Sequence, residues 1–312
     1  MSTKIPLLVL NSLSSAHQAQ IAEIYDATYA FDAAERAAAI AEHGKTFRAV
    51  LTIGVIGITP EEIAALPAVE PICCMGAGYE GVPLEVTRAR GIVTANGAGT
   101  NDDCVADHAF ALLLAVVRGI PTVDAACRQG VWRDRLPLRP NFSHKRLGIL
   151  GLGTIGAKLA QRGQGFDLAI GYHNRKPKPD VAHTYFDSPV ALAEWADYLV
   201  VATPGGAATR YLVDARVLQA LGPRGVLVNI ARGSVVDTLA LADALREGHV
   251  GGAGLDVYES EPEPPSVLFD LPNVVLTPHV AGSSPDAIAA SVERFIENAT
   301  RHFAGQAPVS PV

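Results

Sequence analysis

Short apolar runs alternate with longer amphipathic stretches along the chain. The apolar runs have the length of buried strands, and the stretches between them repeat apolar residues at helical spacing. This alternation is typical of α/β proteins with parallel sheets. In the N-terminal third, the predicted strands lie at residues 5–10, 48–52, 70–74 and 92–94, and the predicted helices at 14–24, 32–43 and 60–66.

The alternation continues after a turn-rich segment at residues 96–101, which suits a crossover between domains. A long helix is predicted over 102–118, and a second turn cluster at 282–285 precedes a last helix over 286–302. Later strands are predicted at 168–172, 198–202, 226–230, 251–255 and 274–276. Because the last helix can return to the first domain, we expect residues 99–285 to form a domain inserted between 1–98 and 286–312.

Composition restricts the kinds of partner. The 312 residues carry a net charge of −7, which argues against nucleic-acid and membrane-surface partners. No apolar run reaches the length of about 18 residues that a spanning helix needs. The N-terminal apolar run has no basic flank and no small-residue cleavage site, so we interpret it as a strand. The four cysteines lack metal-ligand spacing, and we expect no metal and a reducing, cytoplasmic location.

A glycine-rich turn lies between an apolar strand and a helix pattern at residues 147–156. Its glycines follow G-x-G-x-x-G: Gly151 permits the tight turn, Gly153 permits close approach of a pyrophosphate, and Gly156 permits close packing of helix and strand. The alternative is a strand–helix turn without a ligand. The strand and helix around the motif favour a dinucleotide site and a Rossmann-like domain, with cofactor contacts expected at Gly151, Leu152, Gly153, Thr154, Ile155 and Gly156.

The end of the next predicted strand indicates which dinucleotide binds. An acid at this point usually binds the ribose 2′-hydroxyl of NAD, but here the strand is followed by His173, Asn174, Arg175 and Lys176. The guanidinium of Arg175 can bind a 2′-phosphate through paired hydrogen bonds, Lys176 adds a positive charge, and Asn174 can donate a hydrogen bond. We therefore expect NADP, with NADPH preferred over NADH. The alternative is a solvated basic loop in a protein that binds NAD.

Three polar residues follow predicted strands of the same domain: Arg232, Glu261 and His279. Ligands of such sheets bind at the carboxyl ends of the strands. An arginine can bind a substrate carboxylate, a histidine can give a proton to a keto oxygen, and a carboxylate can orient the imidazole. Each residue also has a structural alternative, as a surface pair, a structural histidine or a solvated acid. Together they indicate reduction of a 2-oxo acid.

These motifs resemble those of the D-isomer-specific 2-hydroxyacid dehydrogenases over nearly the whole chain. Within that family the chain is most similar to NADPH-dependent hydroxyphenylpyruvate, hydroxypyruvate and glyoxylate reductases, through Gly222–Leu227 and the basic loop at 174–176. The matching stretches are Met75–Tyr79, Gly148–Gly153, Asn229–Gly233, Gly254–Tyr258 and Thr277–Val280.

The resemblance implies a role for each matching residue. Arg232 corresponds to the substrate-binding arginine, Glu261 to the carboxylate partner and His279 to the acid/base, with Glu261 favoured over Glu259 because it precedes Pro262. Further cofactor contacts are implied at Thr203, Pro204, Ile230, Ala231, Asp256, His279 and Gly282. The substrate carboxylate is expected at the backbone of Gly76, Ala77 and Gly78, in a flavodoxin-like substrate domain. The resemblance also implies a homodimer formed through the helix from Asp102.

Ile53 and Met75 would give the substrate site an apolar wall, so we expect broad specificity for small-molecule 2-oxo acids and 2-hydroxy acids. The expected fold is two Rossmann-like domains with parallel sheets, the cofactor domain inserted in the substrate domain. Two alternatives share this fold: a formate- or phosphite-type dehydrogenase, and a non-catalytic, dinucleotide-sensing protein similar to transcriptional corepressors.

Overall fold

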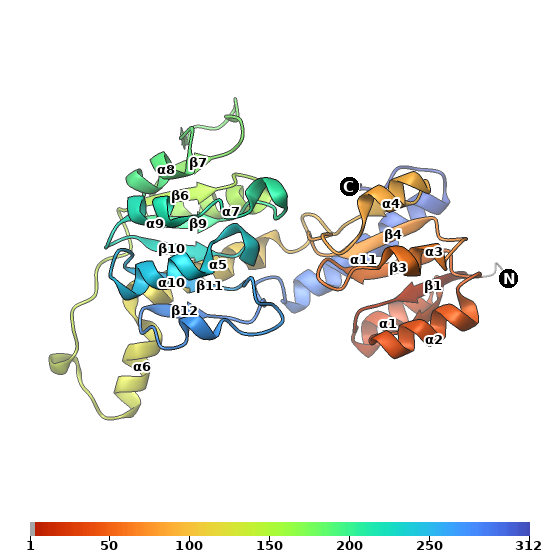
Figure 1. Cartoon of the computed structure of the whole chain (residues 1–312), viewed down its shortest axis with the longest axis horizontal. Helices are drawn as coiled ribbons and strands as arrows, with labels where there is room; N and C mark the ends of the chain where they lie inside the picture. The colour runs from red at the N-terminus through yellow and green to blue at the C-terminus, as the bar shows by residue number, and fades with distance from the viewer. Residues whose placement is uncertain (1–3) are drawn as a thin grey trace. The chain divides into compact units, whose positions relative to one another are not determined.

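The computed structural model describes residues 4–312 and divides into two compact units. The first unit contains residues 4–101 and 282–312, and the second contains residues 102–281. Each is built around one sheet whose strands pair in parallel (Figure 1). The predicted fold class, α/β with two parallel sheets, is confirmed. The assignment of substrate to the first unit and cofactor to the second stays a prediction.

The first unit has a five-stranded sheet in the order β2-β1-β3-β4-β5. Its strands are β1 (Ile5–Val9), β2 (Tyr25–Tyr29), β3 (Ala49–Ile53), β4 (Pro71–Met75) and β5 (Val93–Ala95). Its helices are α1 (Ser15–Ala22), α2 (Ala33–His43), α3 (Pro60–Ala64), α4 (Leu84–Ala89) and α11 (Pro285–Phe303).

Helices cover both faces of this sheet because alternate strand residues point to opposite sides. Leu7 and Val9 of β1 pack with Phe295 of α11, in a core that α1 also joins. Leu8 packs on the other face with Ile63 of α3, in a core shared with α2 and α4. The strands are therefore apolar on both sides, which is why their sequences are continuous apolar runs.

The sheet of the first unit contains a strand, β2, that the sequence analysis missed. β2 pairs in parallel with β1 at the edge of the sheet, between the stretches predicted as helices. Its sequence, Tyr25-Asp26-Ala27-Thr28-Tyr29, is buried only at Tyr25. An edge strand with polar residues on both faces lacks the apolar signal that reveals a central strand.

The second unit has a seven-stranded sheet in the order β12-β11-β10-β9-β6-β7-β8. Its strands are β6 (Arg146–Leu150), β7 (Ala169–His173), β8 (Thr184–Tyr185), β9 (Tyr198–Val201), β10 (Val226–Asn229), β11 (Gly252–Leu255) and β12 (Val274–Leu276). Its α-helices are α5 (Asp102–Arg118), α6 (Ile120–Arg128), α7 (Thr154–Gln164), α8 (Pro189–Trp195), α9 (Ala215–Leu221) and α10 (Thr238–Arg246). Short 3₁₀ turns are η1 (Arg133–Arg135), η2 (Ala207–Thr209), η3 (Gly233–Val235) and η4 (Ser266–Leu268).

Two apolar cores lie on the two faces of this sheet. α5 and α7 pack on one face, against residues such as Ile149 and Val228. α8, α9 and α10 pack on the other face, against residues such as Leu150 and Leu227. On the outer side, Arg162 of α7 binds Asp107 of α5 at 2.6 Å. The sheet is thus fully covered, as expected for parallel strands.

Much of the apolar circumference of α5 is buried within its own unit. Ala106, Ala109 and Leu113 are fully buried in the second unit itself, and Val117 is nearly so. Val116, which was expected on the same face, is only partly buried, so the dimer through α5 stays a prediction. Exposed apolar residues follow directly after α5, and they include Ile120, Trp132 and Leu138.

α6 is a second element that the sequence analysis missed, and it follows a break at Gly119, which has a left-handed φ of 61°. It contains no buried residue, and it extends away from the sheet of its unit (Figure 1). Among residues 4–312, no single helix is both long and apolar enough to cross a membrane. One bent pair, α5 with α6 at 60°, meets that test by length and composition alone.

Candidate active site

The predicted site residues of the second unit collect at one edge of its sheet. The glycine loop follows β6, the basic loop follows β7, and Thr203 and Pro204 follow β9. Arg232 follows β10, Asp256 follows β11 and His279 follows β12. Because these strands are parallel neighbours, their carboxyl ends lie at the same edge. The chain reverses direction across the sheet between β6 and β9, which is where such sheets bind ligands.

The glycine loop is shaped by two close approaches and one open position. Gly151 has a φ of 97°, and a Cβ there would lie 2.8 Å from the backbone of Ala202 and Thr203. A Cβ on Gly156 would lie 2.3 Å from the carbonyl oxygen of Gly151. A Cβ on Gly153 would meet no atom within 4 Å. Gly151 and Gly156 therefore serve the packing of the loop, whereas Gly153 leaves space above it.

The N-terminus of α7 is suited to bind an anion. α7 begins directly after Gly153, and no side chain in residues 4–312 caps it. The first N–H groups of a helix have no partner within the helix, and they carry its positive dipole end. The exposed backbone at Gly153 and Thr154 therefore offers N–H donors and a positive dipole end, which suit a pyrophosphate.

The basic loop after β7 is tied to the glycine loop by Asn174. Its Oδ1 accepts a hydrogen bond of 2.7 Å from the backbone N–H of Leu152. Its backbone carbonyl accepts one of 3.2 Å from the hydroxyl of Tyr185. The side chains of Arg175 and Lys176 are exposed beside it. The sequence analysis expected Asn174 to bind the cofactor, and the structure adds that Asn174 also fixes the position of this loop.

Arg232 lies on a turn that packs against the segment carrying Glu261. A Cβ on Gly233 would lie 1.9 Å from the carbonyl carbon of Tyr258, so only glycine allows this approach of the two backbones. Asn229 Nδ2 donates to the carbonyl of Arg232 at 2.9 Å, which holds the turn. Nη1 of Arg232 donates to the carbonyl of Ala231 at 2.6 Å. The half-buried guanidinium is thereby placed at the end of β10.

Glu261 and His279 form a hydrogen-bonded pair. Oε2 of Glu261 lies 2.9 Å from Nδ1 of His279. The other oxygen of Glu261 accepts a hydrogen bond of 2.8 Å from the backbone N–H of Tyr258. Both side chains are partly exposed, at 27% and 36%. Because Nδ1 is engaged by the carboxylate, Nε2 is the ring nitrogen available to a ligand.

Tyr258 joins the Glu261 segment to the strand ends. Its hydroxyl lies 2.9 Å from the carbonyl of Leu255 and 2.7 Å from that of Thr277. Burial, and next the charge of Asp256, raise the pKa of Tyr258 to about 12. It therefore remains a neutral hydrogen-bond donor across the physiological range.

The turn that carries His279 is wrapped around Asp256. The carbonyl of Asp256 accepts from the N–H of His279 at 2.8 Å, and its two carboxylate oxygens accept from the N–H groups of Val280 and Ala281 at 2.9 Å each. Asp256 is 1% exposed, and Thr277 Oγ1 donates to it at 2.6 Å. The expected contact of Asp256 with the cofactor stays a prediction, whereas these hydrogen bonds show that its carboxylate holds the turn that carries His279.

Apart from Arg232, the predicted substrate residues lie in the first unit, at the ends of its central strands. Ile53 ends β3 and Met75 ends β4. The loop of Gly76, Ala77 and Gly78 follows, and Asn96 Nδ2 donates to the carbonyl of Ala77 at 2.8 Å. These residues are half-buried. Gly282, predicted to contact the cofactor, also belongs to the first unit.

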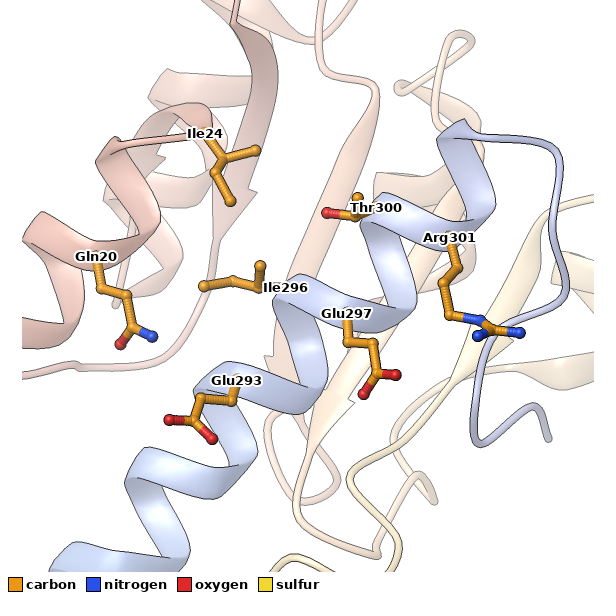
Figure 2. A pocket seen from close by; sticks show the side chains of 7 residues that line it. All are labelled: Gln20, Ile24, Glu293, Ile296, Glu297, Thr300 and Arg301. Carbon is orange, nitrogen blue, oxygen red and sulfur yellow. The ribbon is translucent and has the colours of Figure 1, made fainter.

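A surface hollow of about 370 Å³ also lies in the first unit (Figure 2). Ile24, after α1, and Ile296 of α11 both line it. None of the predicted site residues lines this hollow, so it is separate from the candidate site. Within residues 4–312, no cluster of His, Cys, Asp and Glu is arranged to hold a metal ion.

The sequence analysis missed Tyr258, Thr277 and His108 as parts of the site. Tyr258 and Thr277 lie inside the recognised motifs, so their closeness in sequence to Asp256 and His279 could have identified them. His108 lies in α5, far in sequence from any motif, although its Nε2 is 2.9 Å from Thr277 Oγ1. A single histidine in an apolar helix gave no local signal of this contact.

Comparison with known proteins identifies the same family as the sequence motifs. A family model for the D-isomer specific 2-hydroxyacid dehydrogenase, NAD binding domain, matches residues 110–281. The chain is 41% identical over 274 residues to hydroxyphenylpyruvate reductase of Plectranthus scutellarioides, covering 88% of each chain. It is 36% identical to glyoxylate/hydroxypyruvate reductase A of Arabidopsis thaliana, covering 99% of each.

A solved structure gives a similar result. The chain is 35% identical to NADPH-dependent glyoxylate/hydroxypyruvate reductase of Sinorhizobium meliloti, whose structure contains NADP and malonate. The two structures superpose with a TM-score of 0.91, covering 99% of this chain and 97% of the other.

Proposed function

The chain belongs to the D-isomer specific 2-hydroxyacid dehydrogenase family, and we propose that it reduces 2-oxo acids to D-2-hydroxy acids with NADPH. The resemblance drawn from its motifs is thereby confirmed, and the protein is an oxidoreductase of CH–OH groups. The observation that carries the proposal is the pair of Glu261 and His279 beside the Arg232 turn.

The glycine loop fits a dinucleotide. The open position at Gly153 and the uncapped N-terminus of α7 suit its pyrophosphate. When bound, the reduced nicotinamide supplies a hydride to carbon 2 of the acid. Thr203, Pro204, Ile230 and Ala231, which follow neighbouring strands, are proposed to flank it.

His279 is proposed to supply the proton. Glu261 engages Nδ1, so the proton on Nε2 can pass to the keto oxygen as that oxygen gains negative charge. The carboxylate also stabilises the positive charge of the imidazolium before transfer. In the reverse direction Nε2 accepts the hydroxyl proton.

Arg232 is proposed to bind the substrate carboxylate. A guanidinium can form two parallel hydrogen bonds with a carboxylate, which fixes both position and orientation. The Arg232 turn is held by Asn229 and by its close approach to Tyr258, so the guanidinium is presented from a rigid support.

NADP(H) is proposed as the preferred cofactor. Arg175 and Lys176 are exposed at the end of β7, where an acid would otherwise disfavour a 2′-phosphate. The similar reductase of Sinorhizobium meliloti is NADPH-dependent. Both observations support the preference.

The predicted substrate residues of the first unit are proposed to bind substrate as well. The backbone of Gly76, Ala77 and Gly78 would bind the substrate carboxylate, and Ile53 and Met75 would contact its side chain. An apolar wall discriminates weakly between side chains, so broad specificity is expected.

We also propose a cytoplasmic homodimer. The exposed apolar residues of α6 and the segment after it, such as Ile120, Trp132 and Leu138, support a protein contact surface in this part of the second unit. The four cysteines are free, which suits a reducing compartment. Light scattering at micromolar concentration tests the dimer, and cell fractionation tests the location.

The proposed function is tested by following NADPH and NADH oxidation with glyoxylate, hydroxypyruvate, phenylpyruvate and hydroxyphenylpyruvate. We expect turnover of several of these acids, faster with NADPH. Absence of turnover with all four acids and both cofactors would contradict the proposal. Turnover of glyoxylate alone would contradict the broad specificity.

A further inference from the structure

We infer that His108 is a positioning residue for the acid/base His279, acting from α5 through Thr277 and Asp256. The inference rests on the proposed function, because it assigns a role relative to the proton donor of that function. His108 is the seventh residue of α5, whose buried residues are apolar except for Asp102, and its side chain is 22% exposed. It does not touch the Glu261–His279 pair by any contact described above.

The link begins with a chain of three side chains. His108 Nε2 lies 2.9 Å from Thr277 Oγ1, and Thr277 Oγ1 donates to Asp256 Oδ1 at 2.6 Å. His108 Nε2 is also 3.5 Å from the same carboxylate oxygen. The three residues come from α5 and from the ends of β12 and β11. They connect the helix to two strand ends.

The direction of these hydrogen bonds follows from counting hydrogens. A threonine hydroxyl has one hydrogen, and Thr277 gives it to Asp256. Thr277 Oγ1 can then only accept from the ring of His108, so Nε2 of His108 carries a hydrogen. The role of His108 is therefore that of a hydrogen-bond donor, and an apolar residue in its place would leave Thr277 with an unused acceptor.

Asp256 is the point at which the chain of side chains meets the catalytic turn. One carboxylate oxygen accepts from both Thr277 and the N–H of Val280, and the other accepts from the N–H of Ala281. These N–H groups directly follow His279, whose φ is 54°. A residue other than glycine rarely adopts this conformation, so it needs such support from its neighbours.

The position of the imidazole depends on this support. The side chain of His279 leaves a left-handed backbone, and a small rotation of that backbone would move Nε2 relative to the substrate. Misplacement of a catalytic group by about 1 Å can lower a rate by about a hundred-fold. Loss of the donor at His108 would loosen the carboxylate, and with it the turn, without removing any group that reacts.

The test compares His108→Leu, which removes the donor, with His108→Gln, whose amide can donate from a similar position. Thr277→Val removes the middle of the link, and Asp107→Asn, which alters only the surface pair with Arg162, is the matched control on the same helix. For each variant we would measure kcat and KM with glyoxylate, the Kd for NADPH, and the hydrogen exchange of the Val280 and Ala281 amides.

We expect His108→Leu and Thr277→Val each to lower kcat by about ten-fold, with KM and the NADPH Kd changed less than about two-fold. The Val280 and Ala281 amides should exchange faster in both variants. His108→Gln should keep kcat within about three-fold of wild type, and the Leu/Val double variant should be no worse than Thr277→Val alone, because both changes break one link. Asp107→Asn should leave kcat unchanged.

The wild type and His279→Ala together separate this inference from the proposed function. Absence of turnover in the wild type with all four acids would remove the proposed function itself, whereas retained turnover in His279→Ala would remove the proton-donor role of His279, and with it this inference. If His279→Ala is inactive but His108→Leu has wild-type kcat, only the role of His108 is overturned. Equal impairment of His108→Gln and His108→Leu, or multiplying effects in the double variant, would also overturn it. If His108→Leu does not fold, wild-type kcat and wild-type amide protection in Thr277→Val would be sufficient to reject the link.

Discussion

Glu261 and His279 are 18 residues apart in the chain, yet Oε2 of one lies 2.9 Å from Nδ1 of the other. The neighbouring ends of β11 and β12 bring their segments together, and Tyr258 bonds to both segments. Both residues belong to the second unit, and their hydrogen bond has the geometry of a carboxylate–imidazole pair suited to acid/base chemistry.

Replacement of the acid in this pair tests its role. Glu261→Gln keeps the shape but removes the charge that orients and stabilises the imidazolium, so kcat for reduction should fall by about ten-fold or more. Glu259→Gln is the control, since Glu259 is on the same segment but accepts from the backbone of Thr238 at 3.1 Å. A larger loss of kcat in Glu259→Gln would reassign the partner of His279.

Arg232→Ala should affect binding and turnover together. A charged hydrogen bond to a carboxylate contributes about 1.5–3 kcal/mol, and this contact persists in the transition state, so kcat/KM should fall by a corresponding factor. Arg232→Lys should restore only part of the loss, because an ammonium cannot form the paired contact. Steady-state kinetics measure both, and a KM and kcat equal to wild type in Arg232→Ala would exclude this role.

Arg175→Ala should separate the two cofactors. The variant should weaken NADPH binding by about 1.5–3 kcal/mol, because a charged hydrogen bond to the 2′-phosphate is lost. NADH lacks that phosphate, so its Kd should hardly change. Lys178→Ala, from the same loop, is the control. Titration by fluorescence gives the Kd of each cofactor for the wild type and both variants, and an equal loss for NADPH and NADH in Arg175→Ala would contradict the assignment.

Two alanine substitutions in the glycine loop should affect different properties, one the stability of the protein and the other its affinity for NADPH. Gly156→Ala places a methyl group 2.3 Å from the carbonyl of Gly151, so it should lower the free energy of unfolding by about 1–3 kcal/mol. Gly153→Ala meets no protein atom, so stability should change by less than about 0.5 kcal/mol while NADPH binding weakens. Thermal unfolding and cofactor titration test this, and unaltered NADPH affinity in Gly153→Ala would argue against a pyrophosphate at that position.

The sequence was sufficient where a feature was local. Buried strands such as β6 are continuous apolar runs, and Arg232 and His279 follow such runs within a few residues. β2 was missed because its polar residues hide an edge strand, and α6 because its exposure gives no core pattern. These elements are defined by their neighbours and not by their own sequence.

The support of the site could not be predicted for a related reason. His108 and Thr277 are 169 residues apart, and no periodicity links a helix residue to a turn at that separation. The expected dimer through α5 stays a prediction, because an apolar helix surface has the same sequence pattern whether its own chain or a second copy covers it.

The most direct measurement is the turnover of His279→Ala with NADPH and a 2-oxo acid that the wild type reduces. The variant should lose about 10²–10⁴-fold in kcat, the usual contribution of a positioned acid, while its Kd for NADPH stays close to that of wild type. That result would show that His279 acts in the chemical step and not in cofactor binding. Turnover of His279→Ala near that of the wild type would contradict the account.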